Sequence, residues 1–474
     1  MTGTTAALEL EHGLLQRVLD ENLEIEPSRL RRISDVLGAG ADHGDDRDRE
    51  RFLHERFLEV RRVLREQADQ AVVDRFASPP SGAGAATDVP YGYERSAPST
   101  SLDAKLLDGE TAFVGWTVSG VVCSSGMAAL GLALHVATYD FRAESGRLPS
   151  VAVLGDYFET AMLVELLSTS FASWTHCTSL DELVEAKADV VVIEPVRYNW
   201  GLDAVDFEAL TREWTAGRGP RTIVVDSSLT PSAWPKRQFL AAMAESAAAT
   251  VIEARSALKL DQLGLELANA GAVVVHRNDA VRLAPTDPQM LVNARAVLGA
   301  ALPARSAIAL ENSFFLDSAW RRTHVALVTE NNASFARELA RGPGLFSAVA
   351  HPSTASTSAG RRTGAVKVAP FTVLRLEEDD VEDYRLLLGV IRTEITRRGI
   401  DLQFGASFGF RGHRHETIIP AKRDLRCLLK VAMGARRGPA MNDVIALFRE
   451  LHELRTMDVV RRAFPGARPV ELAL

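Results

Sequence analysis

The sequence predicts an α/β fold: a large domain with a mostly parallel sheet, a smaller α+β C-terminal domain and an N-terminal helical extension. Between residues 111 and 280, short runs rich in β-branched residues alternate with segments that have the apolar spacing of helices. Such alternation is typical of a parallel sheet that is covered by helices on both faces. The expected strands occupy residues 151–155, 191–195, 222–226, 250–254 and 272–276.

The segments on either side of this sheet have different patterns. Residues 1–76 are mostly polar, and their apolar residues recur at helical spacing, so we expect a helical extension. A run of Ser, Pro and Gly at 78–84 then predicts a linker. The resulting domain bounds are 1–76, 77–305 with an arm at 77–110, and 306–474. In the last domain we expect long helices around 311–341, 380–398 and 439–453, and short strands around 364–375 and 403–409.

Composition limits the class of protein. The chain of 474 residues is 46% hydrophobic and carries a net charge of −8, without the basic face that nucleic-acid binding needs. No apolar run approaches the ~20 residues of a membrane helix, and the N-terminus lacks the basic and apolar regions of a signal peptide. The three cysteines are far apart and form no CxxC pair, which indicates neither disulfides nor a zinc site. We therefore expect a cytoplasmic protein that binds neither membrane nor nucleic acid.

The first two candidate features follow strands, because ligand sites in parallel sheets gather at the carboxyl ends of the strands. The turn Ser125-Gly126-Met127 begins an apolar helix, whose N-terminus suits a phosphate. Asp226 ends a strand, where a carboxylate can keep a pyridine nitrogen protonated. For both features the simpler alternative is a helix cap.

Three further features have aromatic or basic side chains. Lys259 follows a predicted strand, and apolar neighbours would desolvate its amine, lower its pKa and make it a nucleophile toward an aldehyde. Tyr157, after another strand, can stack on a flat ring. Tyr93 and Arg95 lie in an irregular segment and can hold a phosphate, because the guanidinium fork matches phosphate oxygens. The alternatives are a surface charge, a core aromatic and a surface loop, respectively.

The order and spacing of these features resemble the pyridoxal 5′-phosphate (PLP)-dependent enzymes of Cys/Met metabolism, which include cystathionine γ-synthase, cystathionine γ-lyase and methionine γ-lyase. Four segments carry the resemblance: YGYERSAPST at 91–100, SSGMAAL at 124–130, VVDSSLTPSA at 224–233 and SALK at 256–259. Glu194-Pro195 followed by Asn199 resembles the family's Glu-x-Pro-x-Asn-Pro with one residue inserted, and GASFGF at 405–410 resembles its Ser-Leu-Gly segment. The resemblance implies PLP fold type I, which is aspartate-aminotransferase-like.

The resemblance also implies roles for individual residues. Lys259 forms the Schiff base with the cofactor and shuttles protons, Asp226 pairs with the pyridine nitrogen, and Tyr157 stacks on the ring. The other cofactor contacts come from Ser125, Gly126, Met127, Asn199 and Ser256 and, across a subunit boundary, from Tyr93 and Arg95. A homodimer or homotetramer with a shared active site follows from these roles.

The departures from the family pattern surround the substrate. Leu258 replaces the Thr before the lysine. The family's carboxylate-binding Arg aligns with Lys430, whose point charge cannot give bidentate recognition. We expect Arg411 to take over that role, with Ser407 close to the substrate. The residues at the reactive end of the cofactor are kept, so the resemblance implies a specialised, biosynthetic enzyme with an unusual substrate.

The predicted function is that of a PLP-dependent lyase or transferase acting at Cβ or Cγ of an amino acid. The reaction would be γ-elimination or γ-replacement through a quinonoid and a vinylglycine-type intermediate, and replacement needs a second, nucleophilic substrate. A bulky substrate such as S-adenosylmethionine is one candidate. An aminotransferase or decarboxylase and a non-catalytic scaffold are the alternatives. His413 and His415 receive little weight as metal ligands, because residues two apart do not share a helix face.

Overall fold

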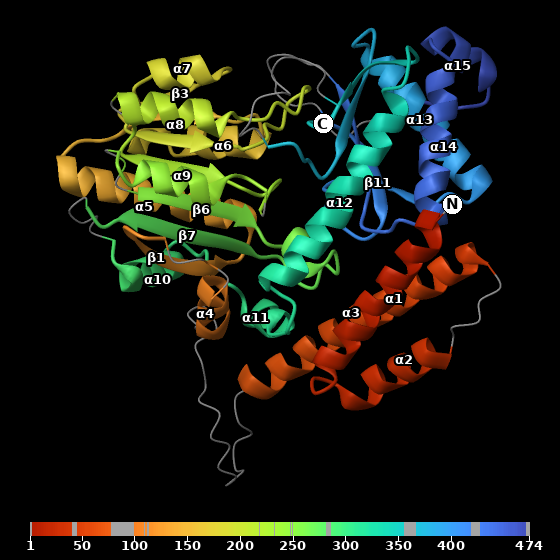
Figure 1. The fold of residues 1–474 in the computed structure, drawn as a ribbon, viewed down its shortest axis with the longest axis horizontal. Helices are drawn as coiled ribbons and strands as arrows, with labels where there is room; N and C mark the ends of the chain where they lie inside the picture. The colour runs from red at the N-terminus through yellow and green to blue at the C-terminus, as the bar shows by residue number, and fades with distance from the viewer. Residues whose placement is uncertain are drawn as a thin grey trace.

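The computed structural model describes residues 2–39, 45–76, 99–108, 110, 113–217, 219–231, 233–246, 248, 250–280, 286–354, 366–418 and 427–470. Figure 1 shows a sheet with helices on both faces, a smaller domain of strands and helices beside it, and three N-terminal helices below the smaller domain. The α/β fold class is therefore confirmed. The domain bounds stay a prediction, and the expected linker at 78–84 lies outside the described residues.

Seven strands form the large sheet, in the order β1-β7-β6-β5-β4-β2-β3. All of them run in one direction except β7, which is antiparallel to both of its neighbours. Their bounds are β1 Trp116–Cys123, β2 Ser150–Leu154, β3 Ser173–His176, β4 Val190–Ile193, β5 Thr222–Asp226, β6 Thr250–Ser256 and β7 Gly271–Asn278. The five predicted strands correspond to β2 and β4 to β7. The sequence patterns missed β1, and they missed β3, whose exposed side chains carry no apolar signal.

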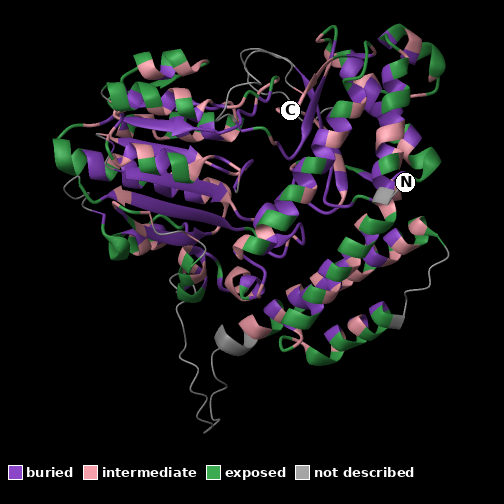
Figure 2. Cartoon of the chain, viewed as in Figure 1, coloured by how far each residue is buried: buried purple, intermediate pink, exposed green. Residues whose placement is uncertain are grey.

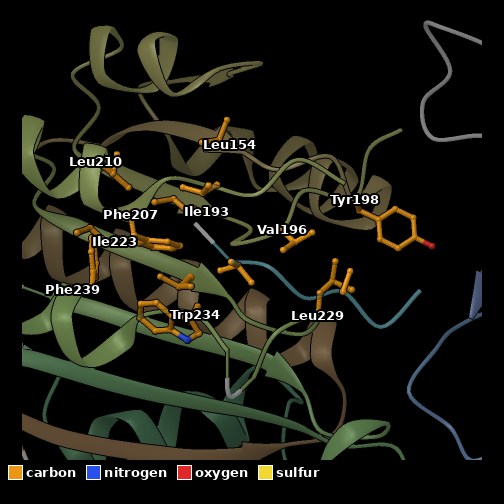
Figure 3. Packing of buried hydrophobic residues seen from close by; sticks show 14 of the residues in the cluster. Leu154, Ile193, Val196, Tyr198, Phe207, Leu210, Ile223, Leu229, Trp234 and Phe239 are labelled. Atoms are coloured by element: carbon orange, nitrogen blue, oxygen red, sulfur yellow. The ribbon is translucent and has the colours of Figure 1, made fainter. Parts of the chain in front are cut away.

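Helices cover both faces of this sheet, as a mostly parallel sheet requires. They are α4 Thr100–Asp108, α5 Gly126–Ser145, α6 Phe158–Leu166, α7 Leu180–Glu185, α8 Phe207–Ala216, α9 Lys236–Met243 and α10 Pro288–Val297. On one face α5 packs on the strands with a buried apolar cluster, and α7 to α9 pack on the other face with a second cluster. Figure 2 shows the central strands almost wholly buried, and Figure 3 shows Phe207 and Phe239 packed over Ile223.

The smaller domain has a five-stranded sheet in the order β10-β11-β12-β9-β8. The strands are β8 Phe346–Ala350, β9 Thr372–Leu376, β10 Leu402–Phe404, β11 His413–Ile418 and β12 Leu428–Ala432. The helices of this domain are α12 Ser318–Leu339, α13 Val381–Arg398, α14 Pro439–Glu453 and α15 Met457–Ala463, and α12 to α14 match the three predicted long helices. Helix α11 Ala304–Leu310 instead packs in one apolar cluster with the N-terminal extension. The strand predicted over 403–409 is wrong beyond Phe404, because Gly405, Ser407 and Gly409 have positive φ and turn the chain.

The N-terminal extension consists of α1 Thr2–Asn22, α2 Pro27–Ala39 and α3 Asp46–Phe76. Its apolar stripes, which include Leu15, Leu19 and Phe57, pack in one cluster with Leu263 and Leu265 of the loop after β6. The extension and the large domain therefore share a hydrophobic core. Within the described ranges, the molecule has no helix with the length and apolar character to span a membrane.

Candidate active site

The parallel strands of the large sheet end at one edge, and the predicted polar residues gather there. Ser125 follows β1, Tyr157 follows β2, and Glu194 follows β4 directly. Asp226 is the last residue of β5, and Lys259 follows β6 by three residues. Side chains at the carboxyl ends of parallel strands face a common crevice, so this edge is the candidate active site.

Lys259 brings a buried amine to this edge of the sheet. Burial lowers the pKa of its amine to about 8, against the opposing effects of the negative charges of Asp226 and Glu159. Its Nζ atom lies 4.2 Å from the centroid of the Phe408 ring, so one side of the amine faces an aromatic surface. An amine in these surroundings is partly neutral near neutral pH and can attack a carbonyl carbon.

The loop that carries Lys259 is tied down on both sides. Asp261 is fully buried and pairs with Arg255, at 3.3 Å, and with Arg321 of α12, at 3.0 Å. Gln262 makes four hydrogen bonds to the backbone of residues 257–268. These contacts fix the backbone on which Lys259 stands, and they connect it to the smaller domain through α12.

Asp226 lies beside Lys259 and is linked to the segment before it. Its Oδ1 atom accepts a hydrogen bond of 3.0 Å from the Ser228 amide, and Ser228 Oγ accepts one of 2.9 Å from the Ser256 amide. Burial raises the pKa of Asp226, and the positive charge of Lys259 opposes this rise. Ser228, which the sequence patterns did not single out, thus connects the two strand ends that carry the carboxylate and the lysine.

The N-terminus of α5 forms a narrow cradle next to Ser256. A Cβ atom on Gly126 would lie 2.8 Å from Ser256 Cβ, so only glycine fits here. Ser125 Oγ accepts a hydrogen bond of 3.0 Å from the Ala128 amide, which is the cap that the simpler alternative predicted. The amides of Gly126 and Met127 belong to the first turn, where a helix offers unpaired N–H groups to an anion. The cradle therefore suits a phosphate.

Glu194 is a buried carboxylate behind Tyr157. It accepts hydrogen bonds from the amides of Asp156, Tyr157 and Tyr198 at 3.0–3.1 Å. Burial, followed by the negative charge of Asp226, raises the pKa of Glu194 to about 7. Burial also raises the pKa of Tyr157, so its hydroxyl keeps its proton. Glu194 was not among the predicted site residues, although a Glu-Pro pair at a strand end was the signal for it.

Lys430 joins the site from the smaller domain. It is 1% exposed on β12, donates a hydrogen bond of 3.0 Å to the Tyr198 hydroxyl, and forms an ion pair with Glu416. Burial and the charge of Lys259 hold its pKa well below the usual range for lysine. The Tyr198 ring in turn lies 5.4 Å from that of Tyr157, and in Figure 3 its hydroxyl points away from the other labelled side chains.

Ser407 lies in the same region as Lys430. Its amide donates a hydrogen bond of 3.2 Å to Glu416 Oε1, and its hydroxyl oxygen is buried without a hydrogen-bond partner among the described residues. Ser407 also has a φ of +85°, which costs free energy for any residue other than glycine. An unpaired hydroxyl on a strained residue beside Phe408 is available to a bound molecule.

Other predicted site residues have partners elsewhere in the chain. Arg411 is buried and forms an ion pair with Glu11 of α1, so its charge is already compensated within the protein. Both ends of the Asn199 amide bond Asp203, at 2.9 and 3.2 Å. Tyr93 and Arg95 lie outside the described residues. The structure therefore does not support the expected roles of Arg411 toward a substrate carboxylate and of Asn199 toward a ring.

His413 and His415 lie on β11, a strand, where residues two apart do share a face. The expectation that they lie on a helix is therefore wrong. His413 Nδ1 accepts a hydrogen bond of 3.0 Å from the Gly434 amide, and His415 Nδ1 lies 3.2 Å from the Gln403 carbonyl oxygen. In the part of the chain that the structure describes, no three His, Cys, Asp or Glu side chains are placed to hold a metal ion.

Comparison with solved structures defines the class of fold. Cystathionine γ-synthase from Xanthomonas oryzae pv. oryzae, solved with cystathionine, matches with a TM-score of 0.55 and 19% identity, over 82% of this chain and 98% of its own. A cystathionine γ-lyase from yeast matches with a TM-score of 0.53 and 16% identity, over 79% of this chain and 89% of its own. A methionine γ-lyase from Micromonospora echinospora has a TM-score of 0.50 and 19% identity, over 70% and 82%.

The chain thus has the fold of the γ-synthases and γ-lyases that its sequence motifs resemble. No model of a protein family matches the sequence, and neither does a curated protein. At these identities the likeness establishes the fold, and the chemistry has to be argued from the site itself.

Proposed function

We propose that the protein is a PLP-dependent enzyme that acts on an amino acid. The observation that carries this proposal is the pairing of a desolvated amine, Lys259, with a buried carboxylate, Asp226, at the edge where α5 offers its N-terminus. The residues fit the cofactor, because glycine at 126 lets the first turn of α5 lie against Ser256, where its unpaired amides can meet a phosphate. When bound there, PLP would supply an aldehyde for the amine and a pyridine ring that accepts an electron pair.

Each residue of the site then has a separate role. Lys259 binds the aldehyde carbon and moves a proton to and from the substrate Cα. Asp226 holds a proton at the pyridine nitrogen, and the amides of Gly126 and Met127 bind the phosphate, with Ser256 beside them. Tyr157 would stack on the ring, and Glu194 keeps the Tyr157 backbone in place through the amide hydrogen bond.

We propose γ-elimination or γ-replacement as the reaction type. The three solved structures above are a γ-synthase and two γ-lyases. The Lys430 amine of the smaller domain donates a hydrogen bond to the Tyr198 hydroxyl, and the Tyr198 ring lies 5.4 Å from that of Tyr157, so these groups are candidates to serve a leaving group. Cystathionine, methionine and S-adenosylmethionine are amino acids with a γ leaving group, and each is a substrate to test. Replacement would need a second, nucleophilic substrate.

We also propose a homo-oligomer with a shared active site. Helix α6 begins directly after Tyr157 and exposes an apolar stripe of Phe158, Met162 and Leu166, which are 40%, 57% and 77% exposed. Residues four apart lie on one helix face, so a second copy that covers this face would lie next to the active site. Tyr93 and Arg95 of that copy are proposed to reach the phosphate.

The test is to add PLP to the purified protein and to record its visible absorbance, and then to assay each candidate substrate for ammonia and a 2-oxo acid. We expect a new absorbance band that Lys259→Ala lacks, and we expect Asp226→Asn to bind PLP with turnover reduced about 100-fold or more. A 2-oxo acid that keeps the whole side chain would favour an aminotransferase instead. A protein that never binds PLP would contradict the proposal and favour a scaffold.

A further inference from the structure

The N-terminal helices α1 to α3 contact the segments on both sides of Lys259. They share a buried cluster with Leu263, Leu265 and Leu267 of the loop that follows it. They also contact Arg411 of the smaller domain through Glu11, and approach Glu266 of the same loop through Arg61. The solved cystathionine γ-synthase spans only 82% of this chain while nearly all of its own length is matched, so this chain has segments beyond the shared fold.

Arg411 makes one of the buried contacts between the extension and the smaller domain, and Glu50 with Arg436 makes another. Its side chain is 6% exposed and forms an ion pair with Glu11 of α1, which is 7% exposed. Its guanidinium carbon lies 3.3 Å from the centroid of the Phe57 ring of α3. A buried guanidinium is costly without a compensating carboxylate. The position of the Arg411 side chain therefore depends on its contacts with Glu11 and Phe57.

The backbone beside Arg411 packs directly on the lysine loop. A Cβ atom on Gly264, whose φ is +69°, would lie 2.6 Å from the Arg411 amide nitrogen. A Cβ atom on Gly409, whose φ is +75°, would lie 3.3 Å from Lys259 Cβ. Between these contacts, the Phe408 ring faces the Lys259 amine at 4.2 Å. Residues 407–411 therefore pack directly against Lys259. A shift of these residues would change the surroundings of its amine.

A second contact runs through Glu266, which follows Lys259 in the same loop. Glu266 has a φ of +50° and pairs with Arg414 of β11 at 3.2 Å. Arg61 of α3 approaches the same carboxylate at 3.9 Å and the Glu266 carbonyl oxygen at 3.5 Å. The extension therefore contacts this region at two places. Glu11 and Phe57 contact Arg411, and Arg61 contacts Glu266 of the lysine loop.

We propose that the N-terminal extension is a positioning element of the active site, in which Glu11 and Phe57 hold Arg411 and thereby keep residues 407–411 against Lys259. Glu11, Phe57 and Arg411 are positioning residues, because they act through Ser407 and Phe408. The effect on catalysis rests on the proposed function, whereas the effect on the order of the segment does not.

The experiment measures amide hydrogen exchange by mass spectrometry on the cofactor-free, full-length protein. In Glu11→Gln we expect peptides covering 405–412 and 257–268 to exchange about tenfold faster, because the buried guanidinium loses its partner. Peptides from α13 should keep the wild-type rate. Phe57→Leu, which keeps an apolar side chain and removes the aromatic face, should act on the same peptides if Glu11→Gln does not fold.

A matched control comes from the same helix. Glu9 lies two residues from Glu11 and pairs with Arg49 inside the extension, at 2.8 Å. Glu9→Gln should leave exchange in 405–412 unchanged. Unchanged exchange in these peptides for both Glu11→Gln and Phe57→Leu would overturn the proposal, and so would an equal rise in all peptides, since the pair would then serve global stability alone.

A second readout uses the PLP-loaded enzyme. If the extension positions residues 407–411, Glu11→Gln should raise KM for the amino acid about tenfold while the affinity for PLP changes little, and Glu11→Asp should restore most of the loss. A wild-type KM together with faster exchange would refute the role in catalysis. Because the exchange data need no cofactor, failure of the proposed function and failure of this inference are separable.

Discussion

At the scale of single residues, the site is a set of ionisable groups whose pKa values burial has moved. Burial makes the neutral form of Lys259 accessible and raises the pKa of both Asp226 and Glu194. Such shifts cluster at functional sites, because a nucleophile and a proton donor both need them. Lys430 is a second buried amine in the same region, and it contacts Glu416 and the Tyr198 hydroxyl.

The pKa of Lys259 sets the pH dependence of cofactor binding. Only the neutral amine attacks an aldehyde, so the rate constant for PLP association should rise with pH and reach half of its maximum near pH 8, since the pKa is lowered to about 8. Stopped-flow absorbance between pH 6.5 and 10.5 checks this, at constant ionic strength. A rate that is still rising steeply near pH 10, where an ordinary lysine titrates, would mean that the amine is solvated.

Because of Glu194, the free energy of unfolding should fall as pH rises, whereas the rate of PLP association should increase. Its pKa is raised from 4.5 to about 7, so between these values the folded protein holds a proton that the unfolded chain has released. The contribution of Glu194 to the free energy of unfolding therefore falls as pH rises from about 4.5 to about 7. Glu194→Gln should remove up to about 3 kcal/mol of this fall. Urea unfolding of both proteins at pH 5 and pH 7.5 measures it, and parallel pH profiles would disprove it.

At the scale of elements, the start of α5 packs closely against Ser256. Gly126→Ala should destabilise the protein by about 1–3 kcal/mol and weaken PLP binding, because its Cβ would clash with Ser256. Gly131→Ala, in the same helix, is the control: its Cβ would lie 3.9 Å from the nearest atom, and alanine favours helix. Urea unfolding and PLP titration distinguish the two. Equal effects of Gly126→Ala and Gly131→Ala would show that Gly126 is not closely packed against Ser256.

The sequence predicted elements best where one pattern decides them. Strands β2 and β4 to β7 are buried on both faces, so their β-branched runs are unambiguous. The residues that follow them, such as Asp226 and Lys259, could be predicted with them. Glu194 follows β4 directly and could have been predicted in the same way, whereas Ser228 could not, because its role depends on backbone amides, which no side-chain pattern reveals. The partner of Arg411 could not be foreseen either, since Glu11 lies at the other end of the chain.

At the scale of the whole molecule, three parts meet at Lys259: the large sheet, the smaller domain and the extension. Their ion pairs, Arg321 with Asp261 and Arg411 with Glu11, are buried, and losing one partner of such a pair costs several kcal/mol. The exposed stripe on α6 adds a fourth surface, which we assign to a second copy of the chain.

The oligomer has its own test. Replacing Met162 and Leu166 together by Glu should convert the oligomer to monomers, because charges cannot be buried against a second apolar stripe. Val297→Glu is a matched control, since Val297 is 78% exposed on α10, away from α6. Light scattering after gel filtration gives the mass of each variant. If the double variant keeps the wild-type mass, or if the wild type is itself a monomer, α6 is not the interface.

The most direct measurement is borohydride reduction of the PLP-treated protein, followed by digestion and mass spectrometry of the peptides. The account predicts that the visible absorbance band disappears and that one pyridoxyl group is found on Lys259. A pyridoxyl group on Lys430 would show that the other buried amine is the nucleophile, and the absence of any modified peptide would show that the site does not bind PLP covalently. Either result would contradict the assignment of Lys259.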